Sequence, residues 1–129
     1  MKNFTISIQT ETRIDELKSN FGQYFPYLKW EFFSAPHSAN QGNTKKEMIN
    51  HNPKIKDITR GIAGHEIHFS DETTVQDLEK LIADQFGLWV QVFRKSGGIW
   101  LETTVTDEWT LAFQNEQGRE LSEQLERKK

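Results

Sequence analysis

The sequence predicts an α+β fold built around a duplicated strand–helix–strand (βαβ) unit, and two observations carry this prediction. Residues 4–33 and 65–93 repeat one order of patterns: an alternating strand, Glu-Thr, a helical stripe that reaches Phe followed by Pro or Gly, and a second alternating strand. Directly afterwards, Ser96-Gly97-Gly98 is typical of a tight hairpin turn. We therefore expect a ferredoxin-like antiparallel sheet with an added C-terminal hairpin strand and two helices on one face. A β-grasp-like sheet is the alternative, whereas a parallel sheet would need more than two helices to cover both faces.

Length and composition are those of one domain spanning residues 1–129. The net charge is −3. Because 12% of the residues are aromatic and only 35% are hydrophobic, a few large side chains must form much of the core. The expected parts, in chain order, are a βαβ unit (3–34), a polar loop (35–54), a second βαβ unit with its hairpin (65–104) and a C-terminal segment (105–129).

The first unit begins with a strand, because apolar and polar residues alternate over residues 4–8. Thr12, with Asp15 three positions later, predicts the start of a helix over 12–23. An aromatic strand over 27–34 completes the unit.

The second unit repeats this order with a strand over 65–70. Thr74 and Asp77 form a capping box, which predicts a helix over 74–86, and the strand over 88–95 follows.

Glycine and polar residues separate these elements. Gly87 fits the position after a helix end, and the turn after residue 95 leads into a strand over 99–104. Residues 35–54 have the composition of an exposed loop, and residues 55–62 predict a short helical turn.

The C-terminal segment gives a weaker pattern. Trp109, Leu111 and Phe113 either alternate as a strand or pack individually, and residues 119–129 predict a short charged helix.

Part of the chain resembles a known family. The matching stretches are Phe86-Gly87-Leu88, Val90-Gln91-Val92-Phe93-Arg94-Lys95-Ser96-Gly97, Trp100-Leu101-Glu102-Thr103-Thr104, Thr106-Asp107 and Trp109-Thr110-Leu111. They cover about the last third of the chain and resemble a family of short bacterial proteins of unknown function. The resemblance supports the hairpin and implies no substrate, cofactor or catalytic residue.

Several kinds of chemistry are excluded. The chain has no cysteine, which removes disulfides, thiolate metal sites and cysteine nucleophiles. His65 and His68 lie three apart on an alternating strand and so point to opposite faces, so we expect no metal and no cofactor. No apolar run approaches the ~18 residues of a spanning helix, and the first residues lack a secretory h-region, so we expect a cytoplasmic protein with no membrane partner.

One titratable cluster is a candidate for acid–base chemistry. Glu31, Glu66, Glu102 and His68 share the open sheet face in the expected arrangement. A solvated charged face balanced by Lys29 explains them more simply. No nucleophile elbow, Walker loop or dinucleotide motif occurs, so we expect no enzymatic activity.

Aromatic and basic residues are the candidates for binding. The aromatic side chains predicted on the polar sheet face are Tyr27, Phe33, Trp89, Phe93 and Trp100, which can anchor a partner or stack bases. The alternative, equally open, is that the segment from Trp109 to Leu125 covers them. A second candidate is the basic patch in the loop, at Lys45 and Lys46.

The predicted function is the binding of another protein, without catalysis, through the aromatic sheet face or the free edge of the hairpin strand. The predicted binding residues are Trp89, Phe93, Trp100, Phe33, Lys45 and Lys46. Single-stranded nucleic-acid binding is the alternative, which the acidic charge and the lack of an RNP-like sequence disfavour. An enzyme using the Glu/His cluster comes third. The sequence does not determine the oligomeric state.

Overall fold

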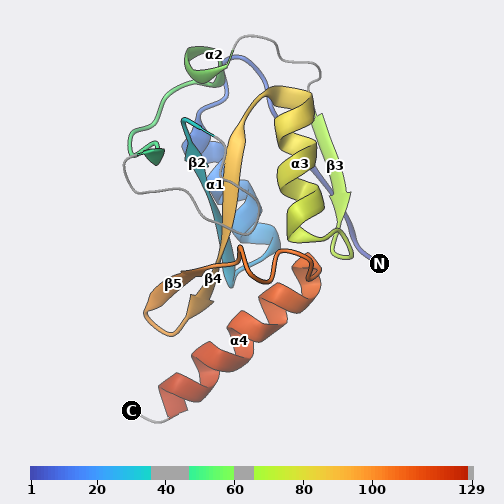
Figure 1. The fold of residues 1–129 in the computed structure, drawn as a ribbon, viewed down its shortest axis with the longest axis vertical. Coiled ribbons are helices and arrows are strands. Elements are labelled where there is room, and N and C mark those ends of the chain that lie inside the picture. The colour runs from blue at the N-terminus through green and yellow to red at the C-terminus, as the bar shows by residue number, and fades with distance from the viewer. Residues whose placement is uncertain (36–46, 60–65, 128–129) are drawn as a thin grey trace.

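The computed structural model describes residues 1–35, 47–59 and 66–127, which form a mixed α+β fold with five strands and four helices (Figure 1). In chain order the elements are β1 (Asn3–Ser7), α1 (Ile14–Tyr24), β2 (Leu28–Phe33), α2 (Ile55–Ile58), β3 (Glu66–Ser70), α3 (Val75–Phe86), β4 (Trp89–Ser96), β5 (Ile99–Glu102) and α4 (Leu111–Arg127). None of these helices is long and apolar enough to span a lipid bilayer. The predicted α+β class is confirmed.

The described strands form two antiparallel sheets. β1 pairs with β3, and Ile6 lies opposite Ile67 in this two-stranded ribbon. The second sheet has the order β2-β4-β5, and Trp30 of β2 lies opposite Val92 of β4. Each strand of the first βαβ unit therefore pairs with the strand that holds the same place in the second unit.

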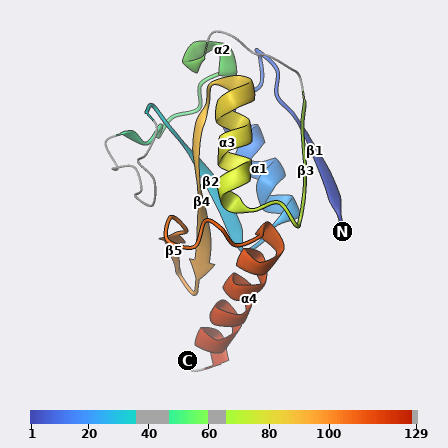
Figure 2. The same cartoon turned by 45° about the vertical axis from the view of Figure 1, so that its right-hand side comes forward.

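The single ferredoxin-like sheet predicted from the repeat is not confirmed. Figure 2 shows α1 and α3 between the β1–β3 ribbon and the three-stranded sheet. Because helices fill this space, the two sets of strands lie too far apart to hydrogen-bond into one sheet. Apolar alternation predicts each strand, but a strand buried on one face has the same pattern in one sheet or in two.

Helices α1 and α3 pack on the same face of the three-stranded sheet, as predicted. The indole nitrogen of Trp30 donates to the carbonyl of Leu17 at 3.0 Å, and its ring stacks on Phe21 with centroids 4.5 Å apart. Leu78 and Ile82 of α3 are buried in the same apolar cluster. Each such side chain contributes about 1.5–3 kcal/mol by leaving water, so this cluster is the main source of stability.

The two long helices of the repeat are capped differently. The Thr74 hydroxyl accepts from the backbone N–H of Asp77 at 3.1 Å, as predicted for α3. The predicted cap of α1 by Thr12 is wrong, because that hydroxyl accepts a bond from the preceding loop. The Asn52 side chain accepts from the backbone N–H of Asp15 instead, at 3.0 Å. A cap that comes from a distant loop leaves no local sequence signal.

The described part of the predicted polar loop packs against the end of β2. The backbone N–H of Ser34 donates to the carbonyl of Glu47, and that of Ile49 donates to Phe32, both at 2.8 Å. The predicted helical turn follows as α2, which buries Ile55.

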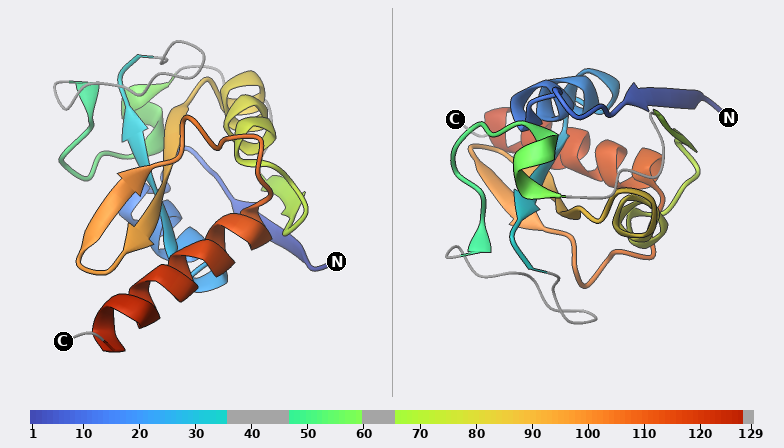
Figure 3. Two further views of the ribbon diagram at one scale, coloured as in Figure 1. Left: turned by 60° about the horizontal axis from the view of Figure 1, so that its bottom comes forward. Right: turned by 90° about the horizontal axis from the view of Figure 1, so that it is seen from above.

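The C-terminal segment contains a longer helix than predicted, since α4 covers 111–127 instead of only the last residues (Figure 3). The segment before it packs at the start of α3, where Val75 donates to the carbonyl of Trp109 at 3.1 Å. Leu111 is buried, whereas Trp109 and Phe113 stay exposed and contact each other edge to face.

Helix α4 packs across β4 and the start of β2. Its Gly118 lies so close to Tyr27 and Arg94 that an added Cβ would meet the Tyr27 Cβ at 2.9 Å. Near the other end, Ser122 accepts a bond from the backbone N–H of Gly97 at 3.1 Å. The C-terminal segment thus covers the sheet on the side of Arg94.

Candidate protein-binding site

The hairpin of β4 and β5 carries three of the predicted binding residues. Gly97 at its turn has a φ of 63°, a conformation that residues with a side chain rarely adopt. The two-glycine turn sets a register in which Ser96 lies opposite Ile99 and Lys95 lies opposite Trp100.

Hydrogen bonds of β4 show the direction of its backbone groups. Lys95 donates its N–H to the carbonyl of Tyr27 at 2.9 Å, on the side of β2. Lys95 and Trp100 therefore form a non-hydrogen-bonded pair of the hairpin, and the backbone groups of Trp100 point away from β4. By the same alternation, the N–H and carbonyl of Glu102, two residues further on, also point away from β4.

The backbone of Val92 points toward β5 but lies beyond its end. Its N–H donates to the Glu79 carboxylate at 3.1 Å, and its carbonyl accepts from the Thr103 hydroxyl at 2.7 Å. The side chains of Glu79 and Thr103 therefore form the hydrogen bonds of Val92 that a longer β5 would otherwise provide. No described strand pairs with the outer edge of β5.

Strand β5 is exposed along its whole length. Three of its four residues are large and apolar: Ile99 is 61% exposed, Trp100 37% and Leu101 38%. An exposed edge strand with unpaired backbone groups and apolar side chains is a template for pairing with another chain.

Lys29 contacts several side chains on the sheet face on which Trp100 lies. The ammonium of Lys29 sits 5.1 Å from the ring centroid of Trp100 and 5.4 Å from that of Phe93. It also lies 3.4 Å from the carboxylate of Glu31, which pairs with Lys18 of α1 at 2.8 Å. The contact with Lys29 therefore keeps the Trp100 ring on the open face of the sheet, on the edge strand β5.

The aromatic face is less open than the alternation predicts. Phe33 is 3% exposed and Phe93 9%, so neither ring can serve as an anchor or a base-stacking platform in this structure. Trp89 is half-buried. Alternation assigns a side chain to a face of the sheet but does not show whether that face is covered.

Phe33 and Trp89 instead line a pocket of about 380 Å³ where β2 ends and β4 begins, a volume typical of small-molecule sites. Its lining residues are Phe32, Phe33, Ser34, Ile49, His51, Asp57, Ile58, Gly87, Leu88 and Trp89. The other pair of predicted binding residues, Lys45 and Lys46, lies outside the described residues.

The predicted Glu/His cluster is not assembled. Glu66 and His68 lie together on β3, with the carboxylate 3.4 Å from the imidazole, and both are largely exposed. Glu31 and Glu102 belong to the other sheet. In the described part of the chain no three His, Asp or Glu side chains gather as potential metal ligands, and His65 falls outside that part.

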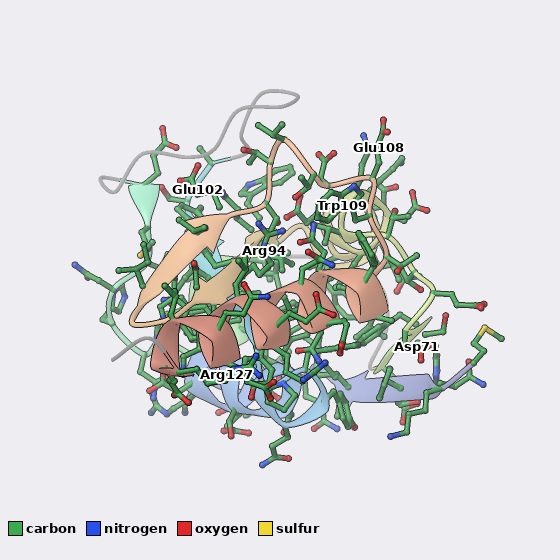
Figure 4. The ribbon with its side chains drawn as sticks, turned by 90° about the horizontal axis from the view of Figure 1, so that it is seen from below. Asp71, Arg94, Glu102, Glu108, Trp109 and Arg127 are labelled. Carbon is green, nitrogen blue, oxygen red and sulfur yellow. The ribbon has the colours of Figure 1, made fainter. Side chains whose placement is uncertain are left out.

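Arg94 is a candidate that the sequence patterns missed. It faces α4, and Figure 4 shows it between β5 and Trp109, alongside that helix. The guanidinium lies 5.6 Å from the ring centroid of Trp109 and donates to the side-chain oxygen of Gln114 at 2.9 Å. By alternation Arg94 continues the inward face of Val90 and Val92. The sequence does not show what covers a charged residue there, because the helix that packs on it is distant in sequence.

Comparison of the chain with protein-family models, curated proteins and solved structures gives no match. The resemblance to a family of short bacterial proteins therefore stays a prediction.

Proposed function

We propose that the protein is a binding module that takes up an extended segment of a partner protein as an additional strand beside β5. The observation that carries this proposal is the edge strand itself, whose four residues are all exposed and whose outer backbone groups have no described partner strand.

The side chains of β5 suit such a partner. Main-chain hydrogen bonds give affinity in strand addition, and alternate side chains give specificity. Trp100 supplies a large, partly buried ring on one face, while Ile99 and Leu101 offer apolar contacts on the other. A partner strand with apolar residues at alternate positions complements both faces.

The experiment replaces Trp100 with a photo-crosslinking phenylalanine derivative in cells, identifies the trapped protein and measures its affinity for purified variants. We expect Trp100→Ala to weaken binding by about 2 kcal/mol, as central aromatic anchors do. A crosslink to a second copy of the chain, with dimers in solution, would identify the partner as the protein itself.

A matched pair of variants tests strand addition directly. The N–H of Glu102 points outward, so Glu102→Pro removes one hydrogen bond to the incoming strand without breaking the hairpin, at about 0.5–1.5 kcal/mol plus the steric effect of the ring. Glu102→Ala keeps this N–H and should bind almost normally. Equal affinities for Glu102→Pro, Glu102→Ala and Trp100→Ala would contradict the proposal.

A further inference from the structure

Arg94 lies on the face of the hairpin opposite Trp100. Its cross-strand neighbour is Leu101, and residues directly opposite each other in a sheet share a face. A ligand of Arg94 therefore lies on the face opposite Trp100, and its binding does not require strand addition, although it would share Leu101 with a strand added beside β5.

The guanidinium is held in place without a counter-charge. Among the described residues Arg94 forms no salt bridge, and its Nε atom is buried without a hydrogen-bond partner. Burial lowers the pKa of Arg94 through loss of hydration. A partly buried charge without an ion partner costs stability, and an anionic ligand would offset this cost.

Gln114 fixes the position of Arg94 but leaves its charge intact. The amide oxygen accepts from Arg94, while the amide nitrogen donates to the Thr106 carbonyl at 2.7 Å and to its hydroxyl at 3.0 Å. Gln114 is fully buried, so this bridge is rigid. Because the Thr106 carbonyl requires an N–H donor, a carboxylate at position 114 would lose these bonds.

Apolar side chains surround the guanidinium. Trp109 packs on Arg94 and contacts Phe113 with ring centroids 4.9 Å apart, and both rings are more than a third exposed. Leu101 lies on the other side, 38% exposed. The site therefore combines an uncompensated positive charge with an apolar surround.

We propose that Arg94 binds the carboxylate of a ligand whose apolar body covers Trp109 and Leu101. Guanidinium groups bind carboxylates in a two-pronged geometry, and the bond is strengthened where water is partly excluded. The carboxylate comes from a chain end, an acidic side chain or a small aromatic acid, and the test separates these sources.

The test follows the Trp109 indole N–H and the Arg94 Nε–H by NMR during titration with N-acetylphenylalanine, which mimics a chain end. N-acetylphenylalaninamide is the neutral control. N-acetylaspartic acid α-amide represents an acidic side chain, and 3-phenylpropionate represents a free acid. We expect saturable shifts with at least one carboxylate, and binding about tenfold weaker or absent with the neutral amide.

Variants assign the binding to Arg94. Arg94→Met should abolish the carboxylate shifts. Leu101→Glu places a carboxylate beside Arg94 without touching Gln114 and should also abolish them. Leu101→Gln loses the same apolar contact but adds no charge, so the carboxylate shifts should weaken and remain saturable. This pair decides the outcome even where Arg94→Met fails to fold.

Three results would overturn the proposal. They are equal binding of the acid and its amide, carboxylate binding that survives both Arg94→Met and Leu101→Glu, and the absence of any saturable shift with all three carboxylates. Binding by one source only would identify the ligand class.

Discussion

Glu11 forms ion pairs with two lysines at the surface of the protein. Its carboxylate lies 2.8 Å from the ammonium of Lys54 and 2.9 Å from that of Lys56. Hydrogen bonds from these two lysines lower the pKa of Glu11 from 4.5 to about 2. The three side chains join the loop before α1 to the start of α2.

We expect Glu11 to titrate well below 4.5 in the folded protein. Since its pKa is lower when folded than when unfolded, its contribution to stability is present above pH 4.5 and is lost as the pH falls from 4.5 toward 2. Carboxyl NMR titration measures this pKa. Because the group is exposed, 1 M salt should raise the pKa toward its ordinary value, and a pKa near 4.5 at low salt would contradict the ion-pair geometry.

Two glycines in helices should respond to alanine in opposite ways. An added Cβ at Gly118 would meet the Tyr27 carbonyl oxygen and the Arg94 Cγ at 3.1 Å each, whereas nothing lies within 4 Å at Gly22 of α1. Alanine gains about 1 kcal/mol over glycine in a helix, but overpacking costs ~1–3 kcal/mol. We expect Gly22→Ala to stabilise the protein and Gly118→Ala to destabilise it.

Urea unfolding of the two glycine variants measures both changes. Stabilisation by Gly118→Ala would show that α4 does not press on β2 and β4 as closely as the structure has it. A loss of stability in Gly22→Ala would instead indicate a contact on the exposed side of α1.

Among the elements of the repeat, one long helix is capped by near neighbours alone and the other also by a residue distant in the sequence. Helix α3 carries its own cap at Thr74 and ends at Gly87, whose φ of 64° is the left-handed conformation typical of a helix end. Helix α1 depends on Asn52, which lies 37 positions away from Asp15. Its start also has a local bond, from the backbone N–H of Arg13 to the Glu16 carboxylate at 3.4 Å, to which the segment before α2 adds the Asn52 acceptor.

We expect Asn52→Ala to lower the free energy of unfolding by about 1 kcal/mol, because it removes the side-chain acceptor at the start of α1. Asn50→Ala, at an exposed position two residues earlier, is the control and should have an effect within ~0.5 kcal/mol. Chemical denaturation provides the comparison. Equal effects of the two variants would show that the Asn52 bond does not stabilise the helix.

At the scale of the whole molecule, neither βαβ segment has a separate core. Ile6 pairs with Ile67 and Trp30 with Val92, so each sheet contains strands from both halves of the chain. Side chains from both helices share one apolar cluster. The two segments therefore stabilise each other.

We expect one cooperative unfolding transition, with the same urea midpoint by tryptophan fluorescence and by far-UV circular dichroism. A fragment of residues 1–59 should be unfolded on its own, since it lacks the partner strands of both β1 and β2. Separate midpoints, or a folded fragment, would contradict the shared core.

The elements that depend on near neighbours follow from the amino-acid sequence alone. Alternation predicted the strands, the Thr74 cap and Gly87 predicted α3, and the Gly97-Gly98 turn predicted the hairpin of β4 and β5. Local rules suffice here because the hydrogen bonds and the backbone conformations lie within a few residues of one another.

Which faces of the sheets are covered, and which distant residues contact one another, depends on tertiary packing. It separated the strands into two sheets, buried Phe33 and Phe93, and left Trp100 exposed on the edge strand. It also brought Gln114 and Trp109 to Arg94. These outcomes depend on contacts between segments far apart in the sequence. An alternating pattern indicates on which side of a strand a residue lies, but it does not indicate what packs against that side.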